Sequence, residues 1–180
     1  MANQIQLLLG ERIRLRALEP HDVEALYQWE NDPAIWKASN TLAPFSRFVL
    51  EQYIASSHLD LHTNKQLRLM ITTRDGKDVG CIDLFDFDPS HQRAGIGILI
   101  AREEDRGKGF ASEALNLLTQ YCFHVLHLHQ IYCNVTVDNE ESIMLFQRHK
   151  FIITGIKKDW VRVGDVFMDE LLMQLVRKAH

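Results

Sequence analysis

The sequence predicts a mixed α/β domain in which about seven strands form one mostly antiparallel sheet and about four helices flank it. Three apolar runs joined by short turns, at residues 67–73, 79–87 and 93–101, predict antiparallel neighbours. Residues 109–127 then show the apolar spacing of a helix, and a further strand follows at 130–137. A strand–helix–strand connection of this length favours a parallel pair, so the sheet is predicted to be mixed.

Length and composition indicate one ordinary soluble domain that spans residues 1–180. Of the 180 residues, 46% are hydrophobic and 24% are charged, which is enough to bury a sizeable core. The net charge of −4, without a run of lysine and arginine, gives no reason to expect a nucleic-acid partner. No segment is long and apolar enough to span a bilayer, so no membrane partner is expected. The three cysteines lie in apolar segments, which favours buried thiols and a cytoplasmic location.

The first predicted elements are a strand and two helices. Residues 12–16 alternate charged and apolar side chains, as in a strand with one buried face. A helix is expected after Pro20 and before Pro33, because the residue before a proline is pushed out of the helical region. Residues 35–44 are then predicted to be irregular. Ser46 is predicted to cap the N-terminus of the second helix.

The later elements complete the sheet. The Asp-Gly pair at residues 75–76 predicts the turn of the first hairpin. Asp138 is predicted to cap the last helix, and Glu141, three residues on, would complete a capping box. Residues 151–156 and 166–172 follow as the last two strands.

A glycine-rich turn joins the third strand of the antiparallel series to the next helix. The first N–H groups of a helix have no intrahelical partner, and the helix dipole places partial positive charge there. Gly107 and Gly109 would let the backbone approach a phosphate closely, while Arg106 and Lys108 add full charges. The glycine spacing fits neither the P-loop nor the dinucleotide-binding fingerprint. The sequence therefore predicts an anion site of another kind.

This turn resembles motif A of the GNAT superfamily of N-acetyltransferases, which reads Arg/Gln-x-x-Gly-x-Gly/Ala and here spans residues 106–111. Residues 139–151 resemble the family's second segment, Asn-x-x-Ala/Ser-x-x-Leu/Ile-Tyr/Phe-x-Lys/Arg-x-Gly-Phe. The order of predicted elements is also that of the GNAT fold, so the resemblance covers nearly the whole chain. Within the superfamily, the sequence looks most similar to spermidine/spermine N-acetyltransferases and to ribosomal-protein N-terminal acetyltransferases.

The resemblance implies acetyl-CoA as the cosubstrate and a sheet that splays between its fourth and fifth strands. Backbone groups freed by the splay would bind the pantetheine arm, and one N–H would polarise the thioester carbonyl. The glycine-rich turn would hold the pyrophosphate, and Asn139 would reach the cofactor from the last helix. By this resemblance, the cofactor-binding residues are Leu99, Ile100, Ala101, Arg106, Gly107, Lys108, Gly109, Phe110, Ala111 and Asn139.

The sequence departs from the family at two catalytic positions. The tyrosine that often serves as the acid falls at Phe146, and the glutamate of the fourth strand falls at Gly95. A base is needed because an alkyl ammonium, with a pKa of about 10.4, is almost wholly protonated at neutral pH. Asp83, Asp86 and His91 are the candidates.

Asp83 and Asp86 match an acidic-x-x-acidic pair of the polyamine enzymes, which suggests that they recognise a cation. Their opposite parity on a strand places them on opposite faces of the sheet unless a bulge intervenes. Each could also simply lie at a solvated strand end, and His91 could be an ordinary turn residue.

The loop that contains Trp36 and Asn40 is predicted to line the acceptor pocket, as the corresponding region does in the GNAT fold. Trp36 could equally plug the core beneath this loop. The loop carries Lys37 and no carboxylate, which argues against a polyamine acceptor. His124, His127 and His129 cluster where a helix ends, but no cysteine or carboxylate completes a ligand set, so no metal site is predicted.

The sequence thus predicts an acetyl-CoA-dependent N-acetyltransferase that moves an acetyl group directly to a primary amine within a ternary complex. The acceptor would be a polyamine or another small amine. Two alternatives remain open: acetylation of a protein N-terminus, and a CoA-binding regulatory module with little catalysis. The sequence names neither the acceptor nor the oligomeric state, a homo-oligomer included.

Overall fold

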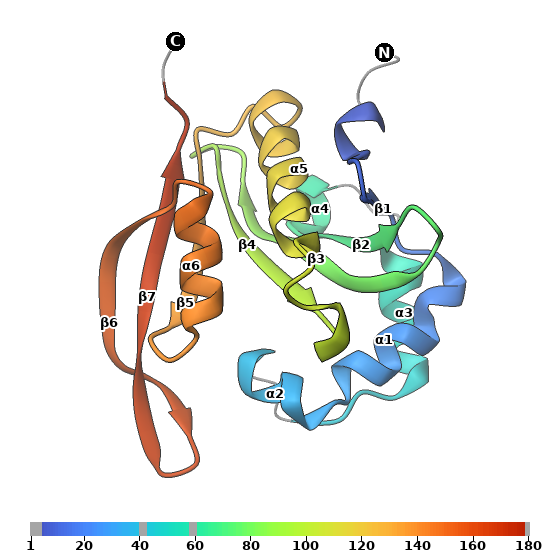
Figure 1. Ribbon diagram of the computed structural model, residues 1–180, viewed down its shortest axis with the longest axis horizontal. Helices are drawn as coiled ribbons and strands as arrows, with labels where there is room; N and C mark the ends of the chain where they lie inside the picture. Colours follow the sequence, from blue (N-terminus) through green and yellow to red (C-terminus); the bar gives the residue numbers. More distant parts are fainter. Residues whose placement is uncertain (1–4, 40–42, 58–60, 179–180) are drawn as a thin grey trace.

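The computed structural model describes residues 5–39, 43–57 and 61–178, and over these residues it contains one seven-stranded sheet in the order β1-β2-β3-β4-β5-β7-β6 (Figure 1). Only the β4–β5 pair is parallel among the strand pairs of the described chain, which confirms the predicted mixed sheet. The strands are β1 (Ile13–Arg16), β2 (Leu67–Thr73), β3 (Asp78–Asp88), β4 (Arg93–Ile100), β5 (Gln130–Thr136), β6 (Ile152–Val163) and β7 (Val166–Val176).

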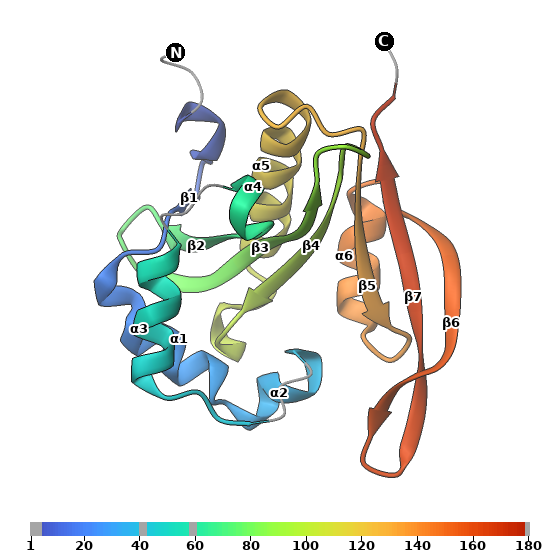
Figure 2. The same ribbon diagram turned by 180° about the vertical axis from the view of Figure 1, so that it is seen from behind.

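Helices cover both faces of the sheet (Figures 1 and 2). Helices α5 and α6 pack on one face and α1 and α3 on the other, so each face has its own apolar cluster. The described residues form the four predicted helices and two short ones besides, α2 and α4. None of these helices has the length and apolarity needed to cross a membrane. The helices are α1 (Val23–Glu30), α2 (Pro33–Ser39), α3 (Arg47–Ser56), α4 (Leu61–Asn64), α5 (Phe110–His124) and α6 (Glu140–Arg148).

The two apolar clusters follow from the alternation of side chains along the central strands. Ile82 and Leu84 on β3 belong to the cluster beneath α5 and are fully buried. Cys81, one position away, belongs to the cluster beneath α1 and α3, together with its cross-strand partner Met70. Burial on both faces is why these strands read as nearly continuous apolar runs.

The segment after α1 corrects one prediction, because residues 35–39 are helical rather than irregular. Pro33 begins α2 instead of only ending the preceding helix. Proline is well tolerated at the first helical position, where its missing N–H would have no intrahelical partner. The Asp32 carboxylate accepts a hydrogen bond from the Ala34 N–H at 2.9 Å, and Ile35 is buried, so a local cap and an apolar contact stabilise the short helix.

Of the two predicted helix N-caps, one is confirmed and one is displaced by a residue. Ser46 caps α3 as predicted, its Oγ accepting a hydrogen bond from the Val49 N–H at 3.2 Å. For α6 the cap is Asn139, whose Oδ1 accepts from the Ser142 N–H at 3.2 Å, and the prediction of Asp138 is one residue early. Asparagine and aspartate cap about equally well, so composition alone could not separate the two neighbours.

Helix α6 ends in a Schellman motif that involves Phe146, in its last turn, and Phe151, just after its end. The Phe151 N–H donates to the Phe146 carbonyl at 3.1 Å, and the Lys150 N–H donates to the Gln147 carbonyl at 3.0 Å. The rings of Phe146 and Phe151 pack edge to face at 5.0 Å, which is the apolar contact usual in this motif. Lys150 has φ +70°, in the left-handed region where the family's second segment has glycine.

Candidate active site

The central cleft lies where β4 and β5 separate. The two strands pair only from Arg93 to Gly95 and from Gln130 to Tyr132, and they then diverge toward their C-terminal ends (Figures 1 and 2). This confirms the predicted splay between the fourth and fifth strands. A cavity of ≈ 1050 Å³ fills the opening. Its lining includes Gly97, Ile98, Arg106, Asn134, Asn139 and Trp160.

The open edge of β4 differs from the prediction at two of the three residues expected to bind the pantetheine arm. The Ala101 N–H donates to the Val79 carbonyl of β3 at 3.0 Å, so the splay does not free this group. Amide groups of alternate residues on a strand point to opposite edges. The peptide groups of Leu99 therefore also face β3, whereas those of Ile98 and Ile100 face the cleft. The sequence did not indicate that the peptide groups of Ile98 face the cleft, because the pairing with β3 decides which edge of β4 each peptide group faces.

The glycine-rich turn lies at the mouth of the cleft and leads directly into α5. Gly107 and Gly109 have φ +70° and +81°, and Gly109 is the N-cap of the helix. Arg106 lines the cavity, and its Nε donates to the Ile100 carbonyl at 3.3 Å. Free N–H groups of the first helical turn, including those of Phe110 and Ala111, are thereby brought next to a cationic side chain. The arrangement can bind a phosphate group.

A buried carboxylate supports this turn. Asp105 is 2% exposed, and its Oδ1 accepts hydrogen bonds from Lys77 Nζ at 2.7 Å and Lys108 Nζ at 3.3 Å. The hydrogen bond from Lys77 opposes the desolvation of Asp105, and the pKa of this carboxyl lies below its usual value. Lys108 is half exposed, so it can move between Asp105 and an anion in the turn.

Neither usual catalytic position can carry out acid–base chemistry. Phe146 is 3% exposed and packs in the Schellman motif. At Gly95, a Cβ atom would overlap the ring of Phe85, which occupies the space that a side chain would need. The Phe85 ring also packs edge to face against Tyr132 at 6.0 Å. Aromatic packing therefore replaces the usual acid and base at both positions.

Asp83 lies beside the cleft but is already paired. Its carboxylate accepts two hydrogen bonds from Arg68, at 2.6 and 3.0 Å, and Arg68 also binds Glu30 of α1. Burial by itself would lower the pKa of Arg68, but the charge and hydrogen bonds of Asp83, together with Cys81 and Tyr53, outweigh burial, and the pKa lies above its usual value. The three side chains are 15–19% exposed and together carry one net negative charge. Asp83 is opposite Gly97 of β4, on the face that bears α1 and α3.

Asp86 lies in a β-bulge and is exposed. The register between β3 and β4 shifts between Phe85 and Asp88, and Asp86 has φ +49°. The bulge brings the Asp86 carboxylate to the Tyr132 hydroxyl, which donates a hydrogen bond at 3.1 Å. Since Tyr132 also packs against Phe85, Asp86 lies toward the same face as Asp83, and the alternative with a bulge is the correct one. Burial, with the nearby Asp86 charge, raises the pKa of Tyr132 to about 12.

The remaining predicted residues lie farther from this centre. His91 is a turn residue: its Nδ1 lies 2.8 Å from Asp88 Oδ2, and its side chain is 69% exposed. Trp36 is half-buried in α2, and its Nε1 donates to the Glu30 carbonyl at 2.7 Å, so it links α2 to the end of α1. Ala34 of the same helix lines the cleft. Asn40 lies outside the described residues.

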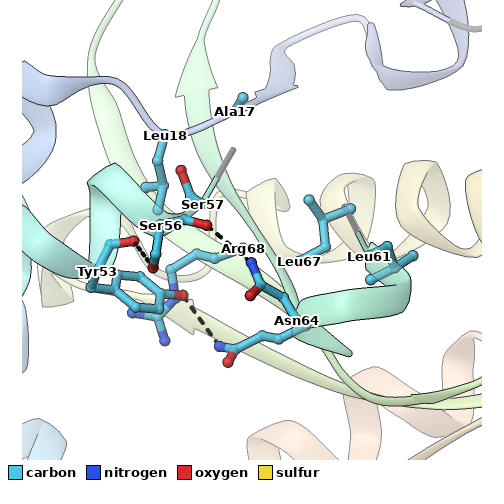
Figure 3. Close-up of a pocket in the computed structure, with 10 residues that line it drawn as sticks. Ala17, Leu18, Tyr53, Ser56, Ser57, Leu61, Asn64, Leu67 and Arg68 are labelled. Atoms are coloured by element: carbon cyan, nitrogen blue, oxygen red, sulfur yellow. Dashed lines mark hydrogen bonds between the residues drawn. The ribbon is translucent and has the colours of Figure 1, made fainter. Parts of the chain in front are cut away.

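A second, smaller cavity of ≈ 220 Å³ lies between α3, α4 and β2 (Figure 3). Tyr53 and Arg68 form one wall, and Asn64 reaches the Ser56 carbonyl across the rim at 3.1 Å. Desolvation raises the pKa of Tyr53 to about 12. Arg68 therefore borders this cavity and also binds Asp83.

Sequence reasoning also missed Trp160 on β6. Its indole is 61% exposed and lines the cleft, and Lys157 Nζ lies 5.0 Å from the ring centroid. An aromatic residue four positions before the Gly164 turn is the signal that could have indicated an exposed side chain at a hairpin. Within the described residues, no group of three or more His, Cys, Asp or Glu side chains is arranged to hold a metal ion.

Comparison with known proteins defines the class of this protein. Residues 12–152 match the family described as "Acetyltransferase (GNAT) domain". The chain therefore belongs to the GNAT acetyltransferase family and is an acyltransferase, as the sequence predicts.

Individual relatives agree with this assignment. The chain is 28% identical to a spermidine N(1)-acetyltransferase of Vibrio cholerae over 175 residues, which cover 96% of this chain and 97% of the relative. It is 29% identical to the N-acetyltransferase p20 of Bacillus licheniformis, over 98% of this chain and 99% of the relative. A crystal structure of spermidine N-acetyltransferase from V. cholerae, in complex with CoA and spermine, superposes with a TM-score of 0.84 at 25% identity, covering 93% of this chain and 96% of that one.

Proposed function

We propose that this protein transfers the acetyl group of acetyl-CoA directly to the primary amine of a small acceptor, with polyamines as the first class to test. The observation that supports it most strongly is the cleft between β4 and β5, which opens at one end onto the glycine-rich turn. A donor with a pyrophosphate, a long amide-containing arm and a terminal thioester matches an anion site followed by an open strand edge.

The donor would bind along β4. The pyrophosphate would occupy the turn at residues 106–111, beside Arg106 and the first N–H groups of α5. The amides of the pantetheine arm would pair with the peptide groups of Ile98 and Ile100. One of these N–H groups can also stabilise the negative charge that develops on the thioester oxygen during attack. Asn139 caps α6 at the edge of the same cavity.

Transfer would be direct because no suitable cysteine nucleophile is available. Cys81, Cys122 and Cys133 are all buried. Burial raises the pKa of each thiol to about 12, so the thiolate is scarce at neutral pH. The amine must therefore attack the thioester itself, and the CoA thiolate leaves. A free thiol has a pKa of about 8.5, so the thiolate leaves readily even though Phe146 replaces the family's usual acid.

The acceptor would approach from the face that carries α1 and α3. Asp86 is the proposed cation site and proton acceptor, because it is exposed and the residue that donates a hydrogen bond to it, Tyr132, is neutral. The charge of Asp83 is compensated by Arg68. Asp83 would therefore act at longer range, through the net negative charge that Glu30, Arg68 and Asp83 carry together. An ammonium group is attracted to such a surface, and a polyamine could bring a second cation to the cluster. The polyamine acceptor is also the one named for the Vibrio cholerae relatives.

The first experiment is CoA release, followed with a thiol reagent, in the presence of acetyl-CoA and a panel of amines. The panel contains spermidine, spermine, diamines, amino-sugar antibiotics, free amino acids, and short peptides beginning with Ala or Ser. Release with polyamines, with kcat/KM reduced about tenfold or more in Asp86→Asn, is the expected result. Glu51→Gln, which removes one exposed carboxylate from α3, is the matched control and should retain full activity.

The same assay tests the two alternatives. Release only with peptides would replace the small-amine acceptor by a protein N-terminus. Acetyl-CoA binding without release from any amine would favour the CoA-binding module, a reading that the aromatic packing at Phe146 and Gly95 supports. Gly109→Val tests the donor site separately, because a side chain there would collide with Arg12 and strain the φ of +81° with which the turn presents its N–H groups. Unchanged acetyl-CoA affinity in that variant contradicts the assignment of the turn.

The proposal includes a cytoplasmic location and a homo-oligomer. Buried, unpaired thiols are compatible with a reducing compartment. Large apolar side chains are exposed on the β6–β7 hairpin at the edge of the sheet, among them Ile152, Ile156 and Phe167. Such a surface favours self-association. Light scattering coupled to size-exclusion chromatography measures the oligomeric state, and a monomer at micromolar concentration would contradict this part.

A further inference from the structure

Arg12, the residue immediately before β1, reaches the glycine-rich turn from behind. Its Nη1 donates a hydrogen bond to the Lys108 carbonyl at 2.7 Å, and its Nη2 donates to the Gly109 carbonyl at 3.4 Å. These residues are 96 and 97 positions apart in the chain. One guanidinium therefore holds two successive carbonyls of the turn that begins α5.

Glu113, in the first turn of α5, holds this guanidinium in place. Its Oε2 accepts from Arg12 Nε at 3.0 Å, and its Oε1 accepts from the Arg12 backbone N–H at 3.0 Å. The Glu113 side chain is 13% exposed. Desolvation would raise the pKa of Glu113, but the hydrogen bonds from Arg12 prevail and the pKa lies below its usual value. Arg12 is thus fixed at both its backbone and its side chain.

Two glycines make room for these contacts. A Cβ atom at Gly109 would lie 2.8 Å from Arg12 Nη1, and one at Gly10 would overlap Glu113 Oε1. Gly109 also has φ +81°, which side chains seldom adopt. The missing side chain of Gly109 therefore leaves room for Arg12 to approach the turn from the side opposite the anion site.

Because the peptide bond is planar, this contact also fixes the direction of the N–H groups in the anion site. In a trans peptide, the C=O and the following N–H point in opposite directions. When Arg12 binds the carbonyls of Lys108 and Gly109, the N–H groups of Gly109 and Phe110 must point away from Arg12 and toward the open side of the turn. Both are unpaired groups at a helix N-terminus, so they are available to a phosphate.

We propose that Arg12 is a positioning residue for the pyrophosphate of the donor, acting through the carbonyls of the turn and not through contact with the ligand. The inference rests on the proposed role of the turn as the donor's phosphate site. Its effect is mainly geometric, because Glu113 neutralises the charge of Arg12. The Gly109 carbonyl also accepts the helical hydrogen bond of the Glu113 N–H at 3.1 Å, so the peptide group that depends on Arg12 is the one between Lys108 and Gly109. Without Arg12, this peptide group could rotate, and the phosphate would have to order it on binding.

The test compares two donors by calorimetry. Acetyl-CoA contains the pyrophosphate, and acetyl-pantetheine lacks it. Arg12→Ala should weaken acetyl-CoA binding about tenfold or more and leave acetyl-pantetheine binding unchanged. The matched control is Arg47→Ala, which removes another half-exposed arginine paired with a single glutamate, Glu24, and should leave both affinities unchanged. A general loss of folding would weaken the binding of both donors, so the ratio of the two affinities isolates the nucleotide end of acetyl-CoA, which carries the pyrophosphate.

The outcomes separate this inference from the proposed function. If the unaltered protein binds the two donors equally, the assignment of the turn to the pyrophosphate fails. If it prefers acetyl-CoA and Arg12→Ala preserves the same preference, the role of Arg12 is refuted. Should Arg12→Ala fail to fold, Arg12→Lys keeps the charge but cannot reach both carbonyls and Glu113 together. A reduced preference for acetyl-CoA in a folded Arg12→Lys protein supports the inference, and an unchanged preference overturns it.

Discussion

Lys150 offers a test of the local physics that is independent of function. The residue is exposed and follows the C-cap of α6 with φ +70°. A side chain in the left-handed region costs about 1–2 kcal/mol. Lys150→Gly removes that strain, while the greater freedom of glycine in the unfolded chain costs about 0.5–1 kcal/mol. The net expectation is a protein more stable by about 0.5–1 kcal/mol.

Urea unfolding measures this change. With a slope of about 2 kcal/mol per molar urea, the midpoint should rise by about 0.3–0.5 M without a change in slope. Two variants serve as controls. Lys150→Ala removes the same side-chain atoms but retains the strained backbone, so it should show no gain. Arg148→Gly places glycine two residues earlier, inside α6, and should lower the stability by about 0.5–1 kcal/mol.

Two outcomes would contradict a role for backbone strain at residue 150. If Lys150→Ala stabilises as much as Lys150→Gly, the gain comes from loss of the lysine side chain and not from the backbone. If Lys150→Gly destabilises, relief of the backbone strain at residue 150 does not compensate for the entropy of glycine in this protein.

Three further predictions concern packing, charge and pH. Gly95→Ala should lower the free energy of unfolding by about 1–3 kcal/mol, because its Cβ would overlap the Phe85 ring; Phe85→Leu in the same chain should relieve much of the loss, as urea unfolding of the double variant would show. Arg68→Met should lower the free energy of unfolding by about 3 kcal/mol, since it leaves the two half-buried carboxylates of Glu30 and Asp83 without their cation. Adding Asp83→Asn should recover part of that loss, and strictly additive losses in the double variant would contradict the coupling. Burial lowers the pKa of His149, so the unfolded chain binds a proton first as the pH falls, and stability should decline below about pH 6.5. His149→Gln should flatten this decline in urea titrations between about pH 7.5 and 5.5.

Most of the framework was predictable because its signals are local. The Asp-Gly turn, the apolar strands beside it and the glycine-rich start of α5 depend on neighbouring residues, and each was found where expected. The parallel β4–β5 pair follows from the handedness and length of one connection. The failures were also local in kind. Pro33 can end one helix or begin another, and Asp138 and Asn139 compete for the same cap.

The candidate site was only partly predictable, because its chemistry depends on partners that are far apart in the sequence. Nothing near Asp83 indicates that Arg68 binds it, and nothing near Gly95 indicates that Phe85 fills the space beside it. The bulge at Asp86 decides which face its carboxylate reaches, and a bulge is set by the pairing of two strands.

Local patterns specify the order of elements, the mixed sheet and the glycine-rich start of α5, since periodicity, turn chemistry and helix termini act over a few residues. The packing of distant segments specifies which side chains are occupied by apolar contacts and ion pairs and which remain accessible for chemistry. Strand register, burial and the approach of Arg12 to the turn arise when distant segments meet. Local propensity cannot specify these contacts, because their energy belongs to pairs of residues and not to either one alone.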